Sequence, residues 1–207
     1  MTNNKDVPLS ASDRRDPATA GAGAAAASGS SSAVVAQAST DAPPQAPAPG
    51  RVLVEQRGPI LMIGLDRPQA QNRFDPPMLI GLGKAYYQLE HDDALRVAVL
   101  YGVGPNFCAS LDVAAYAAAQ ASELLPPKDP DFMNPLGLRP PLRTKPVVVA
   151  VQGITTSVGD EIFLSADIRV ASSDTVFAQY EVTRGVFPGG GATVRLTREA
   201  GWGNAMR

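Results

Sequence analysis

The sequence predicts one α/β domain over residues 51–207, and three observations support this fold class. Short runs rich in Val, Ile and Leu, typical of strands, alternate with stretches whose apolar residues recur at helical spacing. Gly- and Pro-containing turns separate these stretches. The length is ample for one hydrophobic core and short for two ordinary domains.

The first 50 residues differ sharply in composition, because Ala, Ser, Gly, Pro, Thr and Asp dominate them. Ordering a residue costs roughly 1–2 kcal/mol, and such a segment cannot bury enough apolar surface to offset that cost. We therefore predict a disordered low-complexity leader at residues 1–50, followed by the core domain at residues 51–207.

The leader does not match a targeting signal. Arg14 and Arg15 precede a small-residue run that ends in Ala36-Gln37-Ala38, but residues 21–32 lack the large apolar side chains of a secretory signal. Four aspartates count against a mitochondrial transit peptide, and no run approaches the ~18 apolar residues of a membrane span. We predict a cytoplasmic protein that is not bound to membranes.

Charge and cysteine content exclude several classes of partner. The formal net charge is −2, and the 18 Lys and Arg residues are scattered, which argues against nucleic-acid binding. The single Cys cannot form an intramolecular disulfide, and one Cys with one His makes an ordinary zinc site improbable. A small-molecule substrate and no metal are expected.

The first predicted elements are a β-hairpin and a helix. Residues 52–56 and 60–65 form two strand-like runs around the turn signal Arg57-Gly58-Pro59. Asp75 is a candidate N-cap before two prolines, and the helix should run to about His91. The apolar positions expected to face the core are Met78, Leu82, Ala85, Tyr86 and Leu89.

Two apolar runs, residues 96–101 and 146–151, predict strands of a buried sheet. Between them we expect a helix near residues 113–124 and a long Pro-rich surface loop over residues 125–145. Loops of this kind often border ligand sites.

The remaining chain predicts a short helix at residues 161–166, a strand at residues 168–171 and a sharp loop at residues 189–191. A last helix should start at Ala192 and continue to the end of the sequence without a capping signal. The strand-strand-helix order at residues 51–91 suggests a structural unit that repeats.

Four segments, in order, resemble signatures of the enoyl-CoA hydratase/isomerase (crotonase) family. LDRPQAQNRFD at residues 65–75 is similar to L-N-R-P-x-x-x-N-A, and NFCASLDV at residues 106–113 is similar to F-C-A-G-x-D. KPVVVAVQGITTSVGDEIF begins a segment at residues 145–172 that resembles K-P-V-I-A-A-V-N-G-x-x-x-G-G-G-x-E-L. FAQYEVTRGVFPGGG begins the fourth, at residues 177–196, which resembles F-x-x-P-E-x-x-x-G-x-x-P-G-x-G.

The resemblance implies a crotonase-like (ClpP/crotonase) α/β fold, a spiral of β-β-α units around a thioester pocket. Family members usually continue into C-terminal helices that build a homo-trimer or hexamer, and this trimerisation region is expected to be absent here. The implied substrate is an acyl-CoA thioester, so that CoA belongs to the substrate and no cofactor is needed.

The resemblance also implies an oxyanion hole, two backbone N–H donors that stabilise the enolate formed from the thioester. By position in the motifs, the donors are the amides of Ala109 and Val158. The family commonly has Gly where this sequence has Ser110, Ser157 and Val158, and a β-branched residue cannot adopt positive φ cheaply. Substrate-binding residues carried over with this loop are Ala109, Ser110, Leu111, Asp112 and Val158, with Gln69 near the first motif.

Two glutamates match the hydratase positions: Glu161 in VGDEIF and Glu181 in QYEVTRG. Hydration of a conjugated double bond needs one group to activate water and one to deliver a proton, and paired carboxylates can share these roles. Because both glutamates are present, hydration is favoured over isomerisation. An isomerase with one working carboxylate, or an inactive truncated fragment that binds acyl-CoA or joins an oligomer, are the alternatives.

Other polar residues have simpler interpretations. Asp112 is expected to cap the helix after the oxyanion loop, and Asp160 to be an ordinary carboxylate in the first turn of a helix. Cys108 is expected to pack in the core and His91 to be solvated at a helix end. Arg67, with Gln69, could approach the CoA phosphates, or it could cap the sheet edge.

Overall fold

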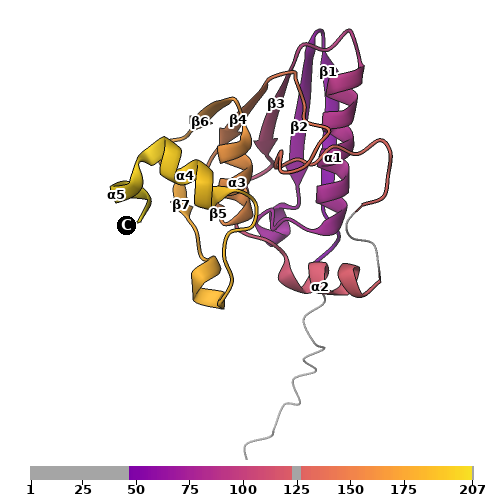
Figure 1. Ribbon diagram of the computed structural model, residues 1–207. Coiled ribbons are helices and arrows are strands. Elements are labelled where there is room, and N and C mark those ends of the chain that lie inside the picture. Colours follow the sequence, from indigo (N-terminus) through magenta and orange to yellow (C-terminus); the bar gives the residue numbers. More distant parts are fainter. Residues whose placement is uncertain (1–46, 123–126, 207) are drawn as a thin grey trace, which may run out of the picture. The chain divides into compact units, whose positions relative to one another are not determined.

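The computed structural model describes residues 47–122 and 127–206, so most of the predicted leader lies outside the described residues. The main sheet has five strands in the order β1-β2-β3-β4-β6 (Figure 1). Their bounds are β1 Arg51–Arg57, β2 Ile60–Asp66, β3 Val97–Gly102, β4 Val147–Val151 and β6 Ile168–Ala171. β1 and β2 pair antiparallel, and β2, β3, β4 and β6 pair parallel to one another.

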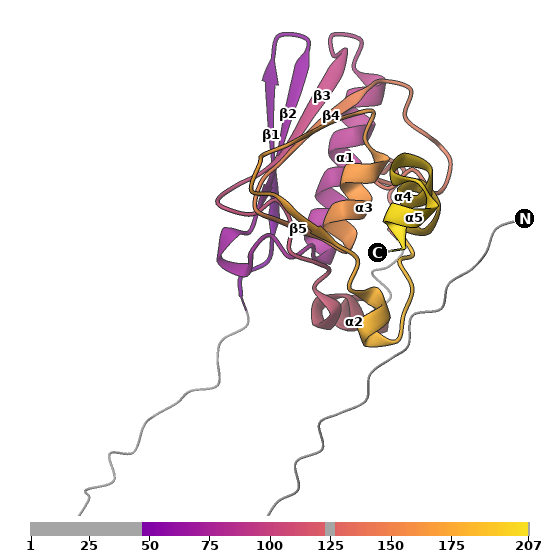
Figure 2. The same ribbon diagram turned by 90° about the vertical axis from the view of Figure 1, so that its left-hand side faces the viewer.

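The predicted hairpin and first helix are confirmed. Gly58, in the left-handed region with φ 58°, forms the turn between β1 and β2. Helix α1 (Pro76–His91) begins where Asp75 Oδ1 accepts a hydrogen bond from the Met78 amide at 3.0 Å. The helix buries its apolar face against the sheet (Figures 1 and 2), and that face contains all the predicted core positions: Met78, Leu82, Ala85, Tyr86 and Leu89.

The sheet is fully buried on one face only, which corrects the prediction of a sheet buried throughout. Along β3 and β4 every second residue is buried, and the residues between them are half-buried. Leu100 and Val149 are fully buried on the covered face, together with Leu61, Ile63 and Leu65 of β2. The continuous Val run of β4 therefore reflects strand propensity as well as burial.

A second sheet of two parallel strands, β5 (Ile154–Thr156) and β7 (Val176–Ala178), was not predicted. Three residues are too few to show a period of two, so neither strand leaves a pattern in the sequence. Helix α2 (Val113–Ala121) matches its prediction up to its end, although residues 123–126 lie outside the described part. The described residues 127–145 form the predicted loop without helix or strand.

Helix α3 (Val158–Ser165) begins three residues before its predicted start. After β6 and β7 come the 3-10 turn η2 (Glu181–Arg184), α4 (Ala192–Ala200) and α5 (Trp202–Ala205). The predicted single last helix is interrupted at Gly201, whose φ of 76° and ψ of 155° are strained for other residues.

The order strand, strand, helix recurs along the chain. It is seen in β1-β2-α1, then, after β3 and α2, in β4-β5-α3, and then in β6-β7-α4, where η2 precedes the helix. Figures 1 and 2 show α1 and α3 on the same side of the main sheet. This is the spiral of β-β-α units that the sequence resemblance implies. No helix within residues 47–122 and 127–206 is long and apolar enough to cross a membrane.

Candidate active site

The loop between β3 and α2, which contains Ala109, is fixed against residues 71–74. The Phe74 amide donates to the Ser110 carbonyl at 2.8 Å, and the Asp112 amide donates to the Phe74 carbonyl at 2.9 Å. The Ala109 amide donates to the Gln71 carbonyl at 3.1 Å. The loop thus has a defined conformation, but one predicted oxyanion donor already has an acceptor.

Arg67 stabilises this loop, and the burial of its guanidinium counts against the predicted approach to CoA phosphates. Its guanidinium is 4% exposed and lies 2.7 Å from Asp112 Oδ2 and 3.6 Å from Asp75 Oδ2. It also donates to the Ala48 carbonyl at 2.9 Å. Gln69, by contrast, is exposed in the 3-10 turn η1 (Pro68–Ala70).

Asp112 caps α2 as predicted, because its Oδ1 accepts from the Ala115 amide at 3.1 Å. Burial acts to raise the pKa of Asp112, but hydrogen bonds from Arg67 and Ala115 outweigh it and hold that pKa below its usual value. Asp112 is therefore a charged group that stabilises the loop and the start of α2.

The second predicted donor, Val158, lies beside the same loop. β5 joins the two segments, since the Cys108 amide donates to the Ile154 carbonyl at 3.1 Å and the Thr156 amide to the Cys108 carbonyl at 3.0 Å. A Cβ placed on Gly159 would meet the Cys108 carbonyl oxygen at 2.5 Å. Glycine at position 159 thus allows α3 to start in direct contact with the loop that contains Ala109.

The strained backbone conformation expected at Val158 occurs instead at Ser157 and Ser110. Ser157, the N-cap of α3, has φ 53° and ψ −120°, and Ser110 has φ 147°. Val158 is the first residue of the helix, where the backbone leaves the amide without an intrahelical acceptor. The positive end of the helix dipole favours negative charge near this amide.

The strain at Ser157 leads to a stability prediction. Replacing Ser157 by Gly should raise the free energy of unfolding by about 1 kcal/mol, because Gly adopts this backbone conformation at little cost. Urea denaturation measures the change, with Ser157→Ala as the control that keeps the strain and should give no gain. A lowered stability for Ser157→Gly would contradict the assignment of strain to this residue.

Glu161 is 4% exposed and points to the amino end of α4. Its Oε1 accepts from the Gly190 amide at 2.6 Å and from the Ala192 amide at 3.4 Å. Burial raises the pKa of Glu161 above its usual value; the two amides oppose this, and the charges of Glu181 and Asp160 add to it. The carboxylate is fixed in position and holds its proton more tightly than a solvated glutamate.

Glu181 begins η2 and lies close enough to Glu161 and Asp160 for its charge to raise the pKa of both. Among the residues that the structure describes, the buried Oε2 of Glu181 meets no hydrogen-bond partner. An acceptor without a donor is costly when buried, so a ligand that offers an O–H is favoured here. The structure thus brings the two predicted glutamates into one electrostatic cluster.

The burial of Asp160 was not predicted from the sequence. Asp160 is in the first turn of α3 as expected, but it is 4% exposed and bonded to Gln179. Burial raises its pKa; the hydrogen bond from Gln179 opposes the rise, and the charge of Glu181 adds to it. Its only signal in the sequence is its place beside Glu161.

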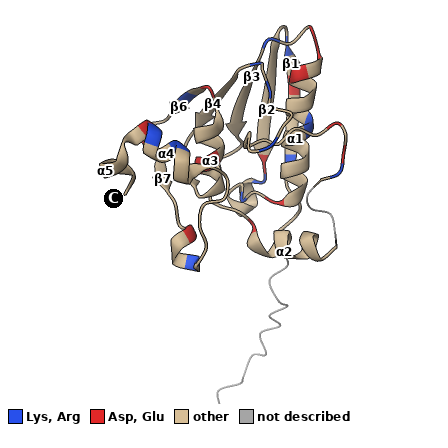
Figure 3. Ribbon diagram, viewed as in Figure 1, with Lys and Arg blue, Asp and Glu red and all other residues tan. Residues whose placement is uncertain are grey.

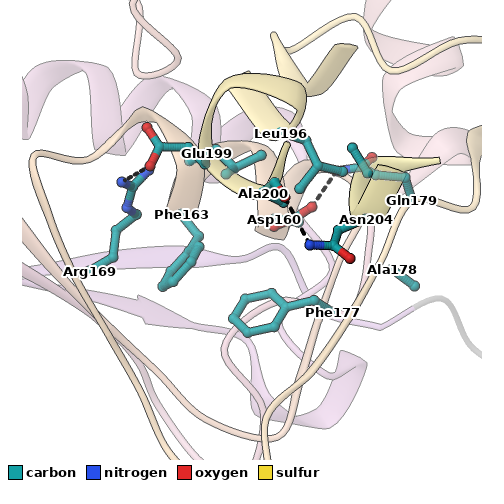
Figure 4. A pocket seen from close by; sticks show the side chains of 12 residues that line it. Asp160, Phe163, Arg169, Phe177, Ala178, Gln179, Leu196, Glu199, Ala200 and Asn204 are labelled. Atoms are coloured by element: carbon teal, nitrogen blue, oxygen red, sulfur yellow. Dashed lines mark hydrogen bonds and ion pairs between the residues drawn. The ribbon is translucent and has the colours of Figure 1, made fainter. Parts of the chain in front are cut away.

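An open pocket of about 650 Å³ adjoins this cluster (Figure 4). Asp160 and Gln179 form part of its wall, and the aromatic rings of Phe163 and Phe177 form another part with centroids 4.8 Å apart. The other side comes from α4 and α5. The pocket is mixed in character, and it reaches the cluster through Asp160, because neither Glu161 nor Glu181 is among its lining residues.

Cys108 and His91 have the surroundings that the sequence predicts. Cys108 is fully buried, as predicted, and burial raises the pKa of its thiol to about 12. His91 is exposed at the end of α1 and stacks on Tyr87.

Within the described ranges no group of three His, Cys, Asp or Glu residues is arranged to hold a metal ion. Figure 3 shows basic residues on several separate elements.

Comparison with known proteins identifies the family. The family model for enoyl-CoA hydratase/isomerase matches residues 55–207. The chain belongs to the enoyl-CoA hydratase/isomerase family. Enoyl-CoA hydratase EchA19 of Mycobacterium tuberculosis is 33% identical over 155 residues, which cover 71% of this chain and 56% of that protein. The short-chain-enoyl-CoA hydratase of Clostridium acetobutylicum is 34% identical over 157 residues, 75% of this chain and 59% of that protein.

Solved structures of the enoyl-CoA hydratase/isomerase family share the fold. A probable enoyl-CoA hydratase/isomerase from Mycobacterium abscessus is 45% identical with a TM-score of 0.70, over 75% of this chain and 60% of that one. A carnitinyl-CoA dehydratase from Mycobacterium avium is 34% identical with a TM-score of 0.67, over 77% and 61%. The fold is thus the crotonase fold, and the chain spans less than two thirds of the length of these relatives.

Proposed function

We propose that this protein adds water to the double bond of a 2-enoyl-CoA thioester. The observation that carries the proposal is that the half-buried carboxylate of Glu181 acts electrostatically on the buried carboxylate of Glu161, which lies in the first turn of the helix that starts at Val158. Relatives named as enoyl-CoA hydratases support the same reaction. CoA would enter as part of the substrate, and no metal or separate cofactor is required.

The thioester carbonyl would lie against the Val158 amide and the loop at Ala109. Attack of water at C3 moves negative charge onto the thioester oxygen, and each preorganised donor is worth roughly 10²- to 10³-fold in rate. The Val158 amide has no hydrogen-bond acceptor within its own helix. The Ala109 amide would serve by sharing its hydrogen with the Gln71 carbonyl, or by releasing that 3.1 Å bond when the thioester binds.

The two glutamates would hold the attacking water between them. One carboxylate accepts a proton from the water while the other delivers a proton to C2, so that the pair is unchanged after one turnover. Burial and the negative charges of Glu181 and Asp160 raise the pKa of Glu161, which favours its protonated form. With one protonated and one ionised carboxylate, the two glutamates would supply the acid and the base at once.

The deciding experiment is an assay of the purified protein with crotonyl-CoA, in which hydration removes the absorbance of the conjugated thioester. Loss of absorbance with formation of 3-hydroxybutyryl-CoA is expected. A parallel assay with a 3-enoyl-CoA detects isomerisation. If neither substrate reacts while the protein is folded, the hydratase proposal fails.

We further propose assembly as a homo-trimer or hexamer in the cytosol. The segment from β7 to α5 exposes many large apolar side chains: Val176, Phe177, Tyr180, Val182, Val186, Phe187, Val194, Trp202 and Met206. A surface of this kind is normally covered by another chain or segment. The single cysteine is a free, buried thiol, which fits a reducing compartment. Size-exclusion chromatography with light scattering would measure the assembly.

A further inference from the structure

One hydrogen-bonded cross-link joins the two segments that hold the proposed site. Asp160 Oδ2 accepts from Gln179 Nε2 at 2.7 Å, an interaction drawn in Figure 4. Gln179 Nε2 also reaches the Ser157 carbonyl at 3.4 Å. Next to it, the Ser157 amide donates to the Ala178 carbonyl at 2.8 Å. The strand end that leads to Glu181 is thus fastened to the amino end of α3 by backbone and side chain together.

Asp160 is a costly residue for this place if it serves the fold alone. It is 4% exposed, and its hydrogen-bond partner, Gln179, is neutral. The basic residue on the wall of the same pocket, Arg169, is paired with Glu199 at 2.7 Å (Figure 4). A buried carboxylate without a cation destabilises a fold relative to a neutral residue of similar size. A residue that destabilises the fold in this way is expected to contribute to the site.

We propose that Asp160 is a positioning residue, which holds Glu181 in register with Glu161 and the Val158 amide through its bond to Gln179. Gln179 precedes Glu181 by two residues, so a fixed Gln179 side chain limits where η2 can begin. Val158 and Glu161 are on the same helical turn as Asp160 and move with it. This inference rests on the proposed hydratase function for its effect on rate.

The cross-link also has an electrostatic consequence for Glu161. The charged groups that act on Glu161 are Asp160 from its own helix, Glu181 from η2 and Arg195 from α4. The negative charge of Asp160 favours the protonated form of Glu161 and so raises its pKa. A neutral residue at position 160 should therefore lower the pKa of Glu161, and the shift would report that the two carboxyl groups lie close together.

Kinetics of two Asp160 variants test the positioning role. Asp160→Asn keeps an oxygen that accepts from Gln179, so kcat should stay within a few-fold of the wild type. Asp160→Leu removes the acceptor, and kcat should fall roughly 10- to 100-fold with KM little changed, since small misplacements cost up to about 10²-fold. Glu55→Gln is the control, because Glu55 is exposed on β1, and it should leave both constants unchanged. If Asp160→Leu does not fold, Gln179→Leu breaks the same bond from the other side.

Carbon-13 NMR titration of the Glu161 carboxyl tests the electrostatic part without any turnover. Its midpoint should move to lower pH in Asp160→Asn and stay in place in Glu55→Gln. An unmoved midpoint in Asp160→Asn, or an unchanged kcat in Asp160→Leu, would overturn the inference. A shifted midpoint in a protein that hydrates no enoyl-CoA would reject the proposed function and retain the link between Asp160 and Glu161.

Discussion

Replacing Glu161 or Glu181 by Gln is expected to lower kcat for hydration of crotonyl-CoA by roughly 10²- to 10⁴-fold, the usual contribution of a positioned acid or base. Glutamine keeps the shape and can accept the hydrogen bond that Glu161 Oε1 takes from the Gly190 amide. It cannot take up or release the proton that hydration requires. Initial rates of absorbance loss, measured at saturating substrate, give the change in kcat.

The combination of the two substitutions gives a sharper test. If the carboxylates act as one unit, the double variant should be no worse than the weaker single variant by more than a small factor. Glu55→Gln is the control, because Glu55 is exposed on β1 and pairs with the nearby Arg57. Substantial hydration by either single variant would contradict the two-carboxylate mechanism, and retained isomerase turnover by Glu161→Gln would favour the one-carboxylate alternative.

Replacing Val158 by Pro is expected to lower kcat by roughly 10²- to 10³-fold, because proline removes the amide hydrogen proposed to bind the thioester oxygen. Val158 is the first residue of α3, the helical position where proline is best tolerated. Proline also restricts the residue before it, Ser157, to extended conformations, so circular dichroism with thermal unfolding must accompany the kinetics to show that the fold persists.

The control for this prediction keeps the donor and changes the side chain. Val158→Ala retains the amide, and its loss of buried methyl groups should cost about 1 kcal/mol of stability with little change in kcat. Equal activity of Val158→Pro and Val158→Ala would show that the Val158 amide does not stabilise the transition state. In that case the helix end would contribute only through its dipole.

Elements with a local signal were predictable from the sequence. The hairpin at Gly58 and helix α1 with its Asp75 cap follow from turn chemistry, capping and periodicity over a few residues. The same holds for the cap of α2 by Asp112. The interruption of the last helix was missed because Gly201 was not weighed as a breaker, although its residue type signals one.

Features that depend on contacts distant in sequence were not predictable. β5 and β7 are defined by pairing with each other across about twenty residues, and neither carries a period of its own. The positive φ at Ser157 follows from the close approach of α3 to the Cys108 carbonyl, so it falls on the residue before the expected Val158. The two glutamates were placed by motif, whereas the burial of Asp160 and its bond to Gln179 needed coordinates.

The single guanidinium of Arg67 serves as common counter-ion to the carboxylates at the start of two helices, Asp75 of α1 and Asp112 of α2. If the start of either helix moved away, Arg67 would lose one of its two carboxylate partners. A displacement of the Ala109 loop would pull on the longest helix of the described chain as well. The loop is thus anchored to a rigid body, and any adjustment it makes on binding a ligand must be small or must come from rotation of its own peptide planes.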